Sequence, residues 1–136
     1  MAHSPNPFQI AGDDRPDVTN CYCQAFEINS AHLPEEDWMD LQAIVETADT
    51  TLLHFECFTL PDSDAIGFKI LSAPWTDHHL GQYWGYDLQT LHAMQAAEGF
   101  TEETIRVLTL AAQACLRYLV LDPNSNTLEG LPLFDC

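Results

Sequence analysis

The histidines and the acid near residue 78 are the first side chains in this sequence that could do chemistry. The run Asp77-His78-His79, together with His54 and His92 elsewhere in the chain, offers imidazole and carboxylate groups that could bind a divalent metal. Adjacent residues on an extended segment point in opposite directions, so His78 and His79 could not easily share one ion. A metal-binding module or metal-dependent enzyme is therefore an alternative, and a solvated loop is the simpler interpretation.

The sequence patterns that mark common enzyme families do not occur in this chain. It contains no glycine-rich phosphate loop, no G-x-S-x-G nucleophile motif, no H-E-x-x-H zinc motif and no EF-hand loop. Its five cysteines form no C-x-x-C pair, and we expect reduced, buried thiols that act as small hydrophobic residues. A zinc site on Cys21, Cys23 and a distant histidine is the alternative. We therefore expect a protein that is not an enzyme and that uses no metal or other cofactor.

Large aromatic side chains gather in an irregular stretch around Gly81 and Gly85. Tryptophan and tyrosine in such a stretch are typical of binding anchors, because they offer much contact area for little loss of entropy. The alternative is that they cover an open side of the hydrophobic core. The residues are Trp75, Tyr83, Trp84 and Tyr86.

The charge balance is the most unusual property of the chain. It has 4 lysines and arginines against 21 acids, for a formal net charge of −17. Charged residues make up 18%, below the usual value of about 25%, so the chain is poor in bases rather than rich in acids. Direct binding to nucleic acid or to an anionic membrane is disfavoured, because both need clustered lysine and arginine.

The acids gather at the ends of the expected helices and strands, where they would form local negative patches. Such patches would be attracted to the arginine- and lysine-lined grooves of proteins that handle nucleic acid. Halophilic adaptation and plain solubility are the alternative explanations. The candidate residues are Glu35, Glu36, Asp37 and Asp40, then Asp62 and Asp64, then Glu98, Glu102 and Glu103.

A length of 136 residues suits one domain, and 46% hydrophobic residues can build its core. We expect a flexible lead-in over 1–18 and a single α+β domain over 19–136. Hydrophobic periodicity predicts the elements of that domain. Strands are expected at 19–29 (central in the sheet), 51–60, 65–72 and 117–122, helices at 34–48, 87–98 and 102–116, and an edge strand or ordered tail at 128–135.

This order of elements matches a ferredoxin-like split β-α-β-β-α-β sandwich, an antiparallel sheet with helices on one face. A small three-layer α/β sheet is the alternative. No apolar run approaches 18 residues, and the first 16 residues lack the basic and apolar regions of a secretory signal. We therefore expect a cytoplasmic protein without a membrane span.

Two stretches, 28–41 and 110–136, resemble the start and the end of a small uncharacterised domain family encoded by conjugative plasmids, integrative elements and related mobile DNA. The matching residues are Ser30, Ala31 and His32, then Asp122, then Gly130, Leu131 and Pro132. The chain departs from that pattern in the turn at 123–126 and in ending on Cys136. The resemblance implies no activity, but such elements often carry genes that blunt host restriction and CRISPR systems.

Charge and resemblance together predict a non-enzymatic inhibitor, anti-CRISPR or anti-restriction in type, that mimics DNA. It would bind a basic nucleic-acid-handling complex and block access to DNA. The acidic patches would supply attraction, and Trp75, Tyr83 and Trp84 would supply buried contact. An adaptor or structural dimer is a further alternative.

Overall fold

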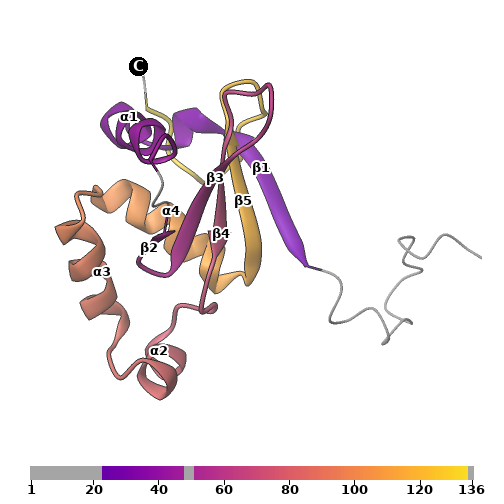
Figure 1. The fold of residues 1–136 in the computed structure, drawn as a ribbon. Helices are drawn as coiled ribbons and strands as arrows, with labels where there is room; N and C mark the ends of the chain where they lie inside the picture. The colour runs from indigo at the N-terminus through magenta and orange to yellow at the C-terminus, as the bar shows by residue number, and fades with distance from the viewer. Residues whose placement is uncertain (1–22, 48–50, 135–136) are drawn as a thin grey trace, which may run out of the picture.

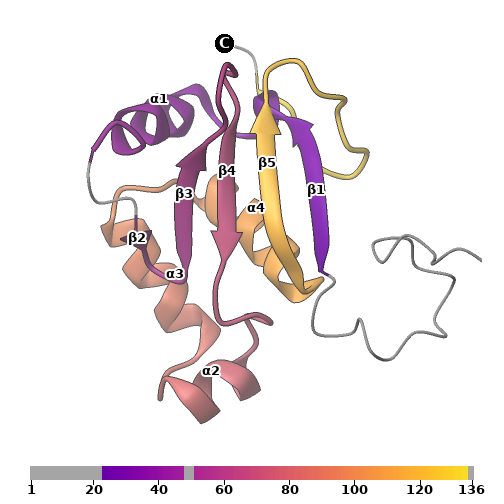
Figure 2. The same cartoon turned by 45° about the vertical axis from the view of Figure 1, so that its right-hand side comes forward.

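A five-stranded mixed sheet organises the residues that this computed structural model describes, 23–47 and 51–134, in the strand order β1-β5-β4-β3-β2. β1 (Gln24–Asn29) is parallel to β5 (Leu116–Asp122), which is antiparallel to β4 (Ile66–Ile70). β3 (Phe55–Thr59) and the short β2 (Thr51–Leu52) continue the sheet in antiparallel fashion (Figure 2).

The α+β class is confirmed, but the ferredoxin-like topology is wrong. The first strand is not central: β1 lies at the edge of the sheet, and the last strand, β5, lies between β1 and β4. Burial explains why β5 rather than β1 is the inner strand: four of the six residues of β1 are exposed, whereas in β5 three leucines are buried and only Arg117 is exposed. Residues 19–22 of the expected strand and the lead-in over 1–18 lie outside the described residues.

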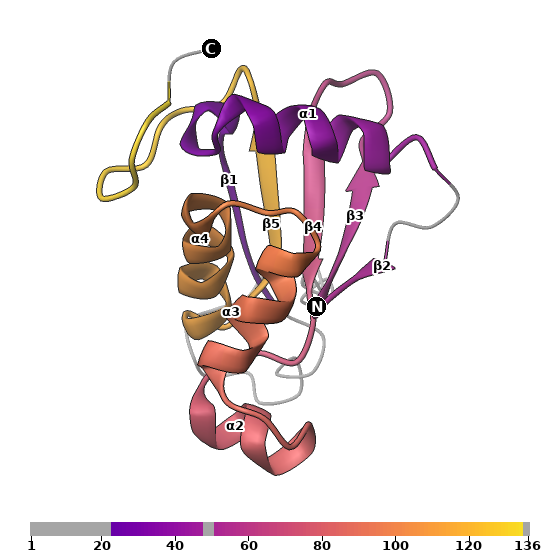
Figure 3. The same cartoon turned by 90° about the vertical axis from the view of Figure 1, so that its left-hand side faces the viewer.

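The helices cover one face and one end of the sheet. α3 (Leu88–Ala97) and α4 (Glu102–Gln113) pack on one face, and α1 (Glu35–Ile44) crosses the end of the sheet (Figure 3). The opposite face carries no helix in the described part of the chain (Figure 2). These helices agree with the three that the sequence predicts, within a few residues at each end.

A helix that the sequence does not predict, α2 (Asp77–Tyr83), forms in the stretch that has no clear period. Its N-cap is Thr76, whose hydroxyl accepts a hydrogen bond from the backbone N–H of His79 at 3.2 Å. A side-chain cap of this kind satisfies one of the free donors at a helix start. Asp87 and Thr101 cap α3 and α4 in the same way.

The expected strand over 51–60 is divided in two. His54 has a φ of 67°, in the left-handed region, so the chain turns there and β2 and β3 are separate strands. The expected hairpin is confirmed: the turn after β3 contains Asp62 and Ser63, and the Ser63 hydroxyl accepts a hydrogen bond from Ala65 N–H at 3.0 Å.

The core lies between the sheet and the helices. Alternate residues of the central strands face α3 and α4, among them Phe68, Leu119 and Leu121, and each is buried. Burying such side chains stabilises the fold by about 1.5–3 kcal/mol each. No helix in the described ranges has the length and apolar character needed to cross a lipid bilayer.

Candidate functional site: an acidic end and an apolar groove

One end of the sheet collects most of the candidate acids. β1, β3 and β5 run in the same direction, so α1, the β3–β4 turn and the turn after β5 all lie at the end where these strands finish (Figures 1 and 2). The start of α4 reaches the same place, because it is hydrogen-bonded to α1. We call the exposed carboxylates carried there the acidic end: Glu35, Glu36, Asp40, Asp62, Asp64, Glu102 and Glu103.

Asp37, a candidate for partner binding, does not belong to this surface. Its side chain is only 1% exposed, so its assignment to an exposed patch is wrong. Its Oδ2 accepts hydrogen bonds from the backbone N–H of Thr101 at 3.1 Å, from the Thr101 hydroxyl at 2.5 Å and from the Thr104 hydroxyl. The carboxyl group therefore joins α1 to the start of α4.

Two of the three described cations lie away from the acidic end, and the third, Arg106, is one helical turn after Glu102 on α4. Lys69 is near the end of β4 and Arg117 near the start of β5, so both are at the opposite end of the sheet, and Arg106 lies within α4. Screening over about 8 Å in physiological salt leaves each carboxylate cluster as a local negative patch. The acidic end thus gathers seven of the sixteen described carboxylates, and others, among them Asp77 and Asp87 at the starts of α2 and α3, lie elsewhere.

The aromatic candidates are separated from the acidic end. Trp75 is fully buried, and its Nε1 donates to the Leu71 carbonyl at 2.8 Å, so it cannot contact a partner and that prediction is wrong. Tyr83 and Trp84 are 65% and 53% exposed, but α2 lies beyond the opposite end of the sheet (Figure 3). The structure therefore does not bring these rings and the acidic end onto one surface.

Glu98, the remaining acidic candidate, is exposed at the end of α3. Its Oε1 accepts a hydrogen bond from the backbone N–H of Leu53 at 3.3 Å. This contact ties α3 to the strand region around β2, and Glu98 is not part of the acidic end.

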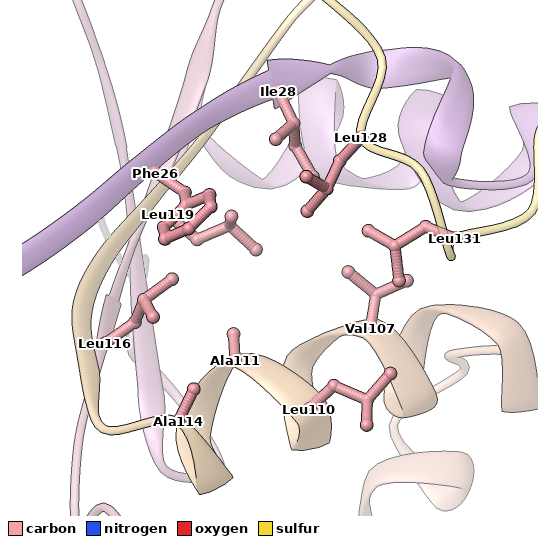
Figure 4. Close-up of a pocket in the computed structure, with 10 residues that line it drawn as sticks. All are labelled: Phe26, Ile28, Val107, Leu110, Ala111, Ala114, Leu116, Leu119, Leu128 and Leu131. Carbon is pink, nitrogen blue, oxygen red and sulfur yellow. The ribbon is translucent and has the colours of Figure 1, made fainter.

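An apolar groove that the sequence analysis missed lies between β1, β5 and α4, with a volume of about 150 Å³ (Figure 4). Side chains from these elements and from the C-terminal segment surround one open space, and all of them are apolar. Phe26 and Leu110 are 44% and 42% exposed along it. We call this space the apolar groove; its lining residues are Phe26, Ile28, Val107, Leu110, Ala111, Ala114, Leu116, Leu119, Leu128 and Leu131.

Carboxylates border the apolar groove. Glu103, part of the acidic end, precedes Val107 by one helical turn on α4 and so lies on the same side of the helix. Glu129 is exposed between the two leucines of the C-terminal segment that line the groove. An apolar centre with a charged rim is the usual anatomy of a protein-binding surface.

The signal for the groove was present in the sequence. α4 carries a second apolar stripe, at positions 107, 110, 111 and 114, beside the stripe that packs on the sheet. A helix with one partner needs only one such stripe. One stripe is enough to predict the helix, so the second stripe is the additional signal for the groove.

The C-terminal segment, residues 123–134, is an ordered tail rather than a strand. His32 is fully buried beneath it; His32 Nδ1 donates to the Pro132 carbonyl, and Leu128 N–H donates to His32 Nε2, both at 2.8 Å. Phe134 N–H donates to the Ala31 carbonyl at 2.8 Å. The two stretches on which the family resemblance rests are therefore in direct contact.

The described histidines do not assemble into a metal site. In the described ranges no three histidine, cysteine or acidic side chains lie close enough to hold an ion. His78 is exposed, the His79 ring packs against Tyr83 at 4.8 Å, and His92 Nε2 pairs with the Thr109 hydroxyl at 3.0 Å.

The cysteines are more exposed than expected. Cys57 is buried, and burial raises the pKa of its thiol to about 12, so it stays protonated and unreactive. Cys23 and Cys115 are exposed free thiols, so the expectation of burial is wrong for these two. Cys21 and Cys136 lie outside the described residues.

His54 is a buried titratable group between the sheet and α2. Its Nε2 is hydrogen-bonded to the Tyr86 hydroxyl, and its ring meets Trp84 edge-on at 4.6 Å. Burial lowers the pKa of His54 and raises the pKa of Tyr86, so the imidazole and the phenol are both neutral in this hydrogen bond. The pair is a structural contact that fixes the loop after α2 against the sheet.

Because the pKa of His54 is lowered on folding, the protein should lose stability as the pH falls below the unfolded-state value of about 6.5. Above that value the imidazole is neutral in both states and contributes nothing to the pH dependence. His54→Asn, which tolerates the left-handed backbone, should show a smaller loss of unfolding free energy between pH 7 and pH 5.5 than the unsubstituted protein. Urea unfolding at both pH values measures this, and the exposed His78→Asn should keep the full loss.

No curated protein and no solved structure matches the chain. The model of a family of unknown function, the DUF5983 C-terminal domain, matches residues 25–136, which include every helix and all but the first residue of the strands described above. The chain therefore belongs to the DUF5983 C-terminal domain family.

Proposed function

We propose that this protein is a non-enzymatic inhibitor that binds a basic nucleic-acid-handling protein through the acidic end and the apolar groove. One observation carries the proposal: the acidic end continues into the rim of the apolar groove, while Lys69 and Arg117 lie at the opposite end. Such a surface attracts a positively charged partner and also offers it an apolar contact.

The charges suit a groove that normally holds nucleic acid. Double-stranded DNA carries one negative charge per about 1.7 Å of its axis, so its binding grooves are lined with lysine and arginine. Closely spaced carboxylates on α1 and at the start of α4 offer those side chains alternative partners. Occupation of the groove by the acidic end would exclude DNA by simple competition.

The apolar groove replaces the aromatic side chains as the source of buried contact. Opposite charges across an interface raise the association rate and specificity more than the affinity. Affinity comes mainly from a few apolar or aromatic anchors that lose all contact with water. An apolar side chain of the partner inserted beside Leu110 and Phe26 would supply that anchor.

A CRISPR effector or a restriction enzyme is the partner class that we favour. The support for this class is the resemblance of residues 28–41 and 110–136 to a family carried by mobile DNA, whose persistence in a host depends on escaping such defences. The inhibitor would act inside the host cell, where these complexes work.

DNA-cleavage assays with a purified restriction enzyme and a purified CRISPR effector test the proposal. We expect the protein to slow cleavage by at least one of them, with inhibition that falls steeply with salt and is overcome by excess DNA. The triple variant E35Q/E36Q/D40N should inhibit about tenfold more weakly, because it removes charge from the acidic end.

A matched control variant changes the net charge by the same amount but at another part of the surface. Q82K/Q89K/A97K adds three charges on α2 and α3, at exposed positions away from the acidic end. This control should inhibit DNA cleavage as strongly as the unsubstituted protein does. Equal weakening by the two triple variants would mean that only net charge matters, and absence of inhibition in both assays would overturn the assignment of partner class.

A further inference from the structure

A polar hollow lies at the end of the sheet opposite the acidic end. The hydrogen-bonded ladder between β4 and β5 ends at the pair Lys69–Tyr118, and beyond this pair the two segments separate. The space between them has a volume of about 460 Å³ and is lined by residues 69–73 and 115–117. That size falls in the range of about 300–1,000 Å³ that is typical of small-molecule sites.

The hollow is lined by positively charged side chains, which are rare in this chain. The described residues include three lysines and arginines, and two of them, Lys69 and Arg117, line the hollow. None of its lining residues is acidic, and Glu56, opposite Lys69 on β3, lies outside the lining. β5 has seven residues, so the acidic end is roughly 20 Å away at 3.3 Å per residue, well beyond the screening length of about 8 Å.

The backbone around the hollow departs from regular structure at three places. Ser72 and Cys115 both have left-handed backbones, with φ of 62° and 59°. The register between β1 and β5 skips Arg117, because Gln24 pairs with Leu116 and Ala25 with Tyr118. Strained residues and bulges cost stability and occur preferentially at binding sites, where they redirect side chains.

We propose that this hollow binds a small phosphate-type oxyanion, either free phosphate or the phosphate group of a larger molecule. The Arg117 guanidinium offers a planar pair of donors that matches two phosphate oxygens, and the Lys69 ammonium adds a second positive charge. The Ser72 hydroxyl and the Cys115 thiol are additional donors at the rim. The site lies at the opposite end of the sheet from the acidic end, and Leu116 lines both the hollow and the apolar groove.

NMR titration of the ¹⁵N-labelled protein with inorganic phosphate, at ionic strength held constant with sodium chloride, tests the proposal. We expect saturable shifts confined to the amides of residues 69–73 and 115–117. A parallel titration with adenosine monophosphate distinguishes the two sources. Tighter binding of the nucleotide, with shifts that extend beyond the hollow, identifies a phosphate monoester, and equal binding identifies free phosphate.

Charge-removing variants decide whether the hollow is a specific site. Arg117→Gln and Lys69→Gln should each weaken binding about tenfold, as expected for the loss of one charge-assisted contact. Arg106→Gln removes the third described cation, which lies outside the hollow, and should leave binding unchanged. Unfolding curves of each variant establish that it is folded. Shifts that do not saturate, or equal weakening by Arg106→Gln and Arg117→Gln, would overturn the proposal.

Discussion

Asp37→Ala should lower the free energy of unfolding by about 3 kcal/mol, because it removes a buried carboxyl group that accepts three hydrogen bonds. The backbone N–H of Thr101 and the hydroxyls of Thr101 and Thr104 would lose their acceptor, and Thr104 is fully buried. Typical domains are stable by only 5–15 kcal/mol, so the loss would be a large share of the total. Urea unfolding followed by tryptophan fluorescence measures it.

Asp40→Ala is the matched control. Asp40 lies on the same helix three residues later, but it is exposed, so its removal should change the unfolding free energy by less than about 0.5 kcal/mol. Asp37→Asn keeps one acceptor and should fall between the two. A similar effect of Asp37→Ala and Asp40→Ala would contradict the role of Asp37 as the link between α1 and α4.

His32→Ala should cost about 2–3 kcal/mol, because it empties a buried position and leaves the Leu128 N–H and the Pro132 carbonyl without partners. The effect should be concentrated in the C-terminal segment. Hydrogen exchange at the Leu128 amide, which donates to His32 Nε2, should accelerate more than exchange in β5. The same variant should open the apolar groove, since Leu128 and Leu131 line it.

His78→Ala provides the comparison, because His78 is an exposed histidine on α2 and its loss should have little effect on stability. If His32→Ala destabilises the protein but leaves exchange at Leu128 unchanged, His32 supports the core rather than the C-terminal segment. If neither quantity changes, the contacts of His32 contribute no net stability.

Most elements of this fold, α2 excepted, were predictable from local patterns, and their arrangement was not. Apolar spacing identified α1, α3 and α4, and the turn residues after β3 identified the hairpin. The position of β5 depends on which strand can be buried on both sides, a comparison between segments far apart in the sequence. The division of β2 from β3 depends on the left-handed backbone at His54, a conformation that histidine adopts only in a suitable tertiary setting.

The acidic clusters were correctly located at the ends of elements, and the topology explains why several of them meet. Asp37 and Trp75 were misassigned because residue type and spacing do not reveal burial. Asp37 follows two exposed glutamates and has the same chemistry, yet its side chain faces α4. The hollow at Lys69 and Arg117 could not be predicted, because it forms where two paired strands separate.

The place of β5 in the sheet has a consequence for synthesis on the ribosome. Within the described residues β1 pairs only with β5, a partner roughly 90 positions later, and such distant pairing is costly in loop-closure entropy. β1 therefore remains unpaired until β5 has been translated. A nascent chain stopped before β5 cannot complete its sheet, so the sheet should form only after β5 has left the exit tunnel.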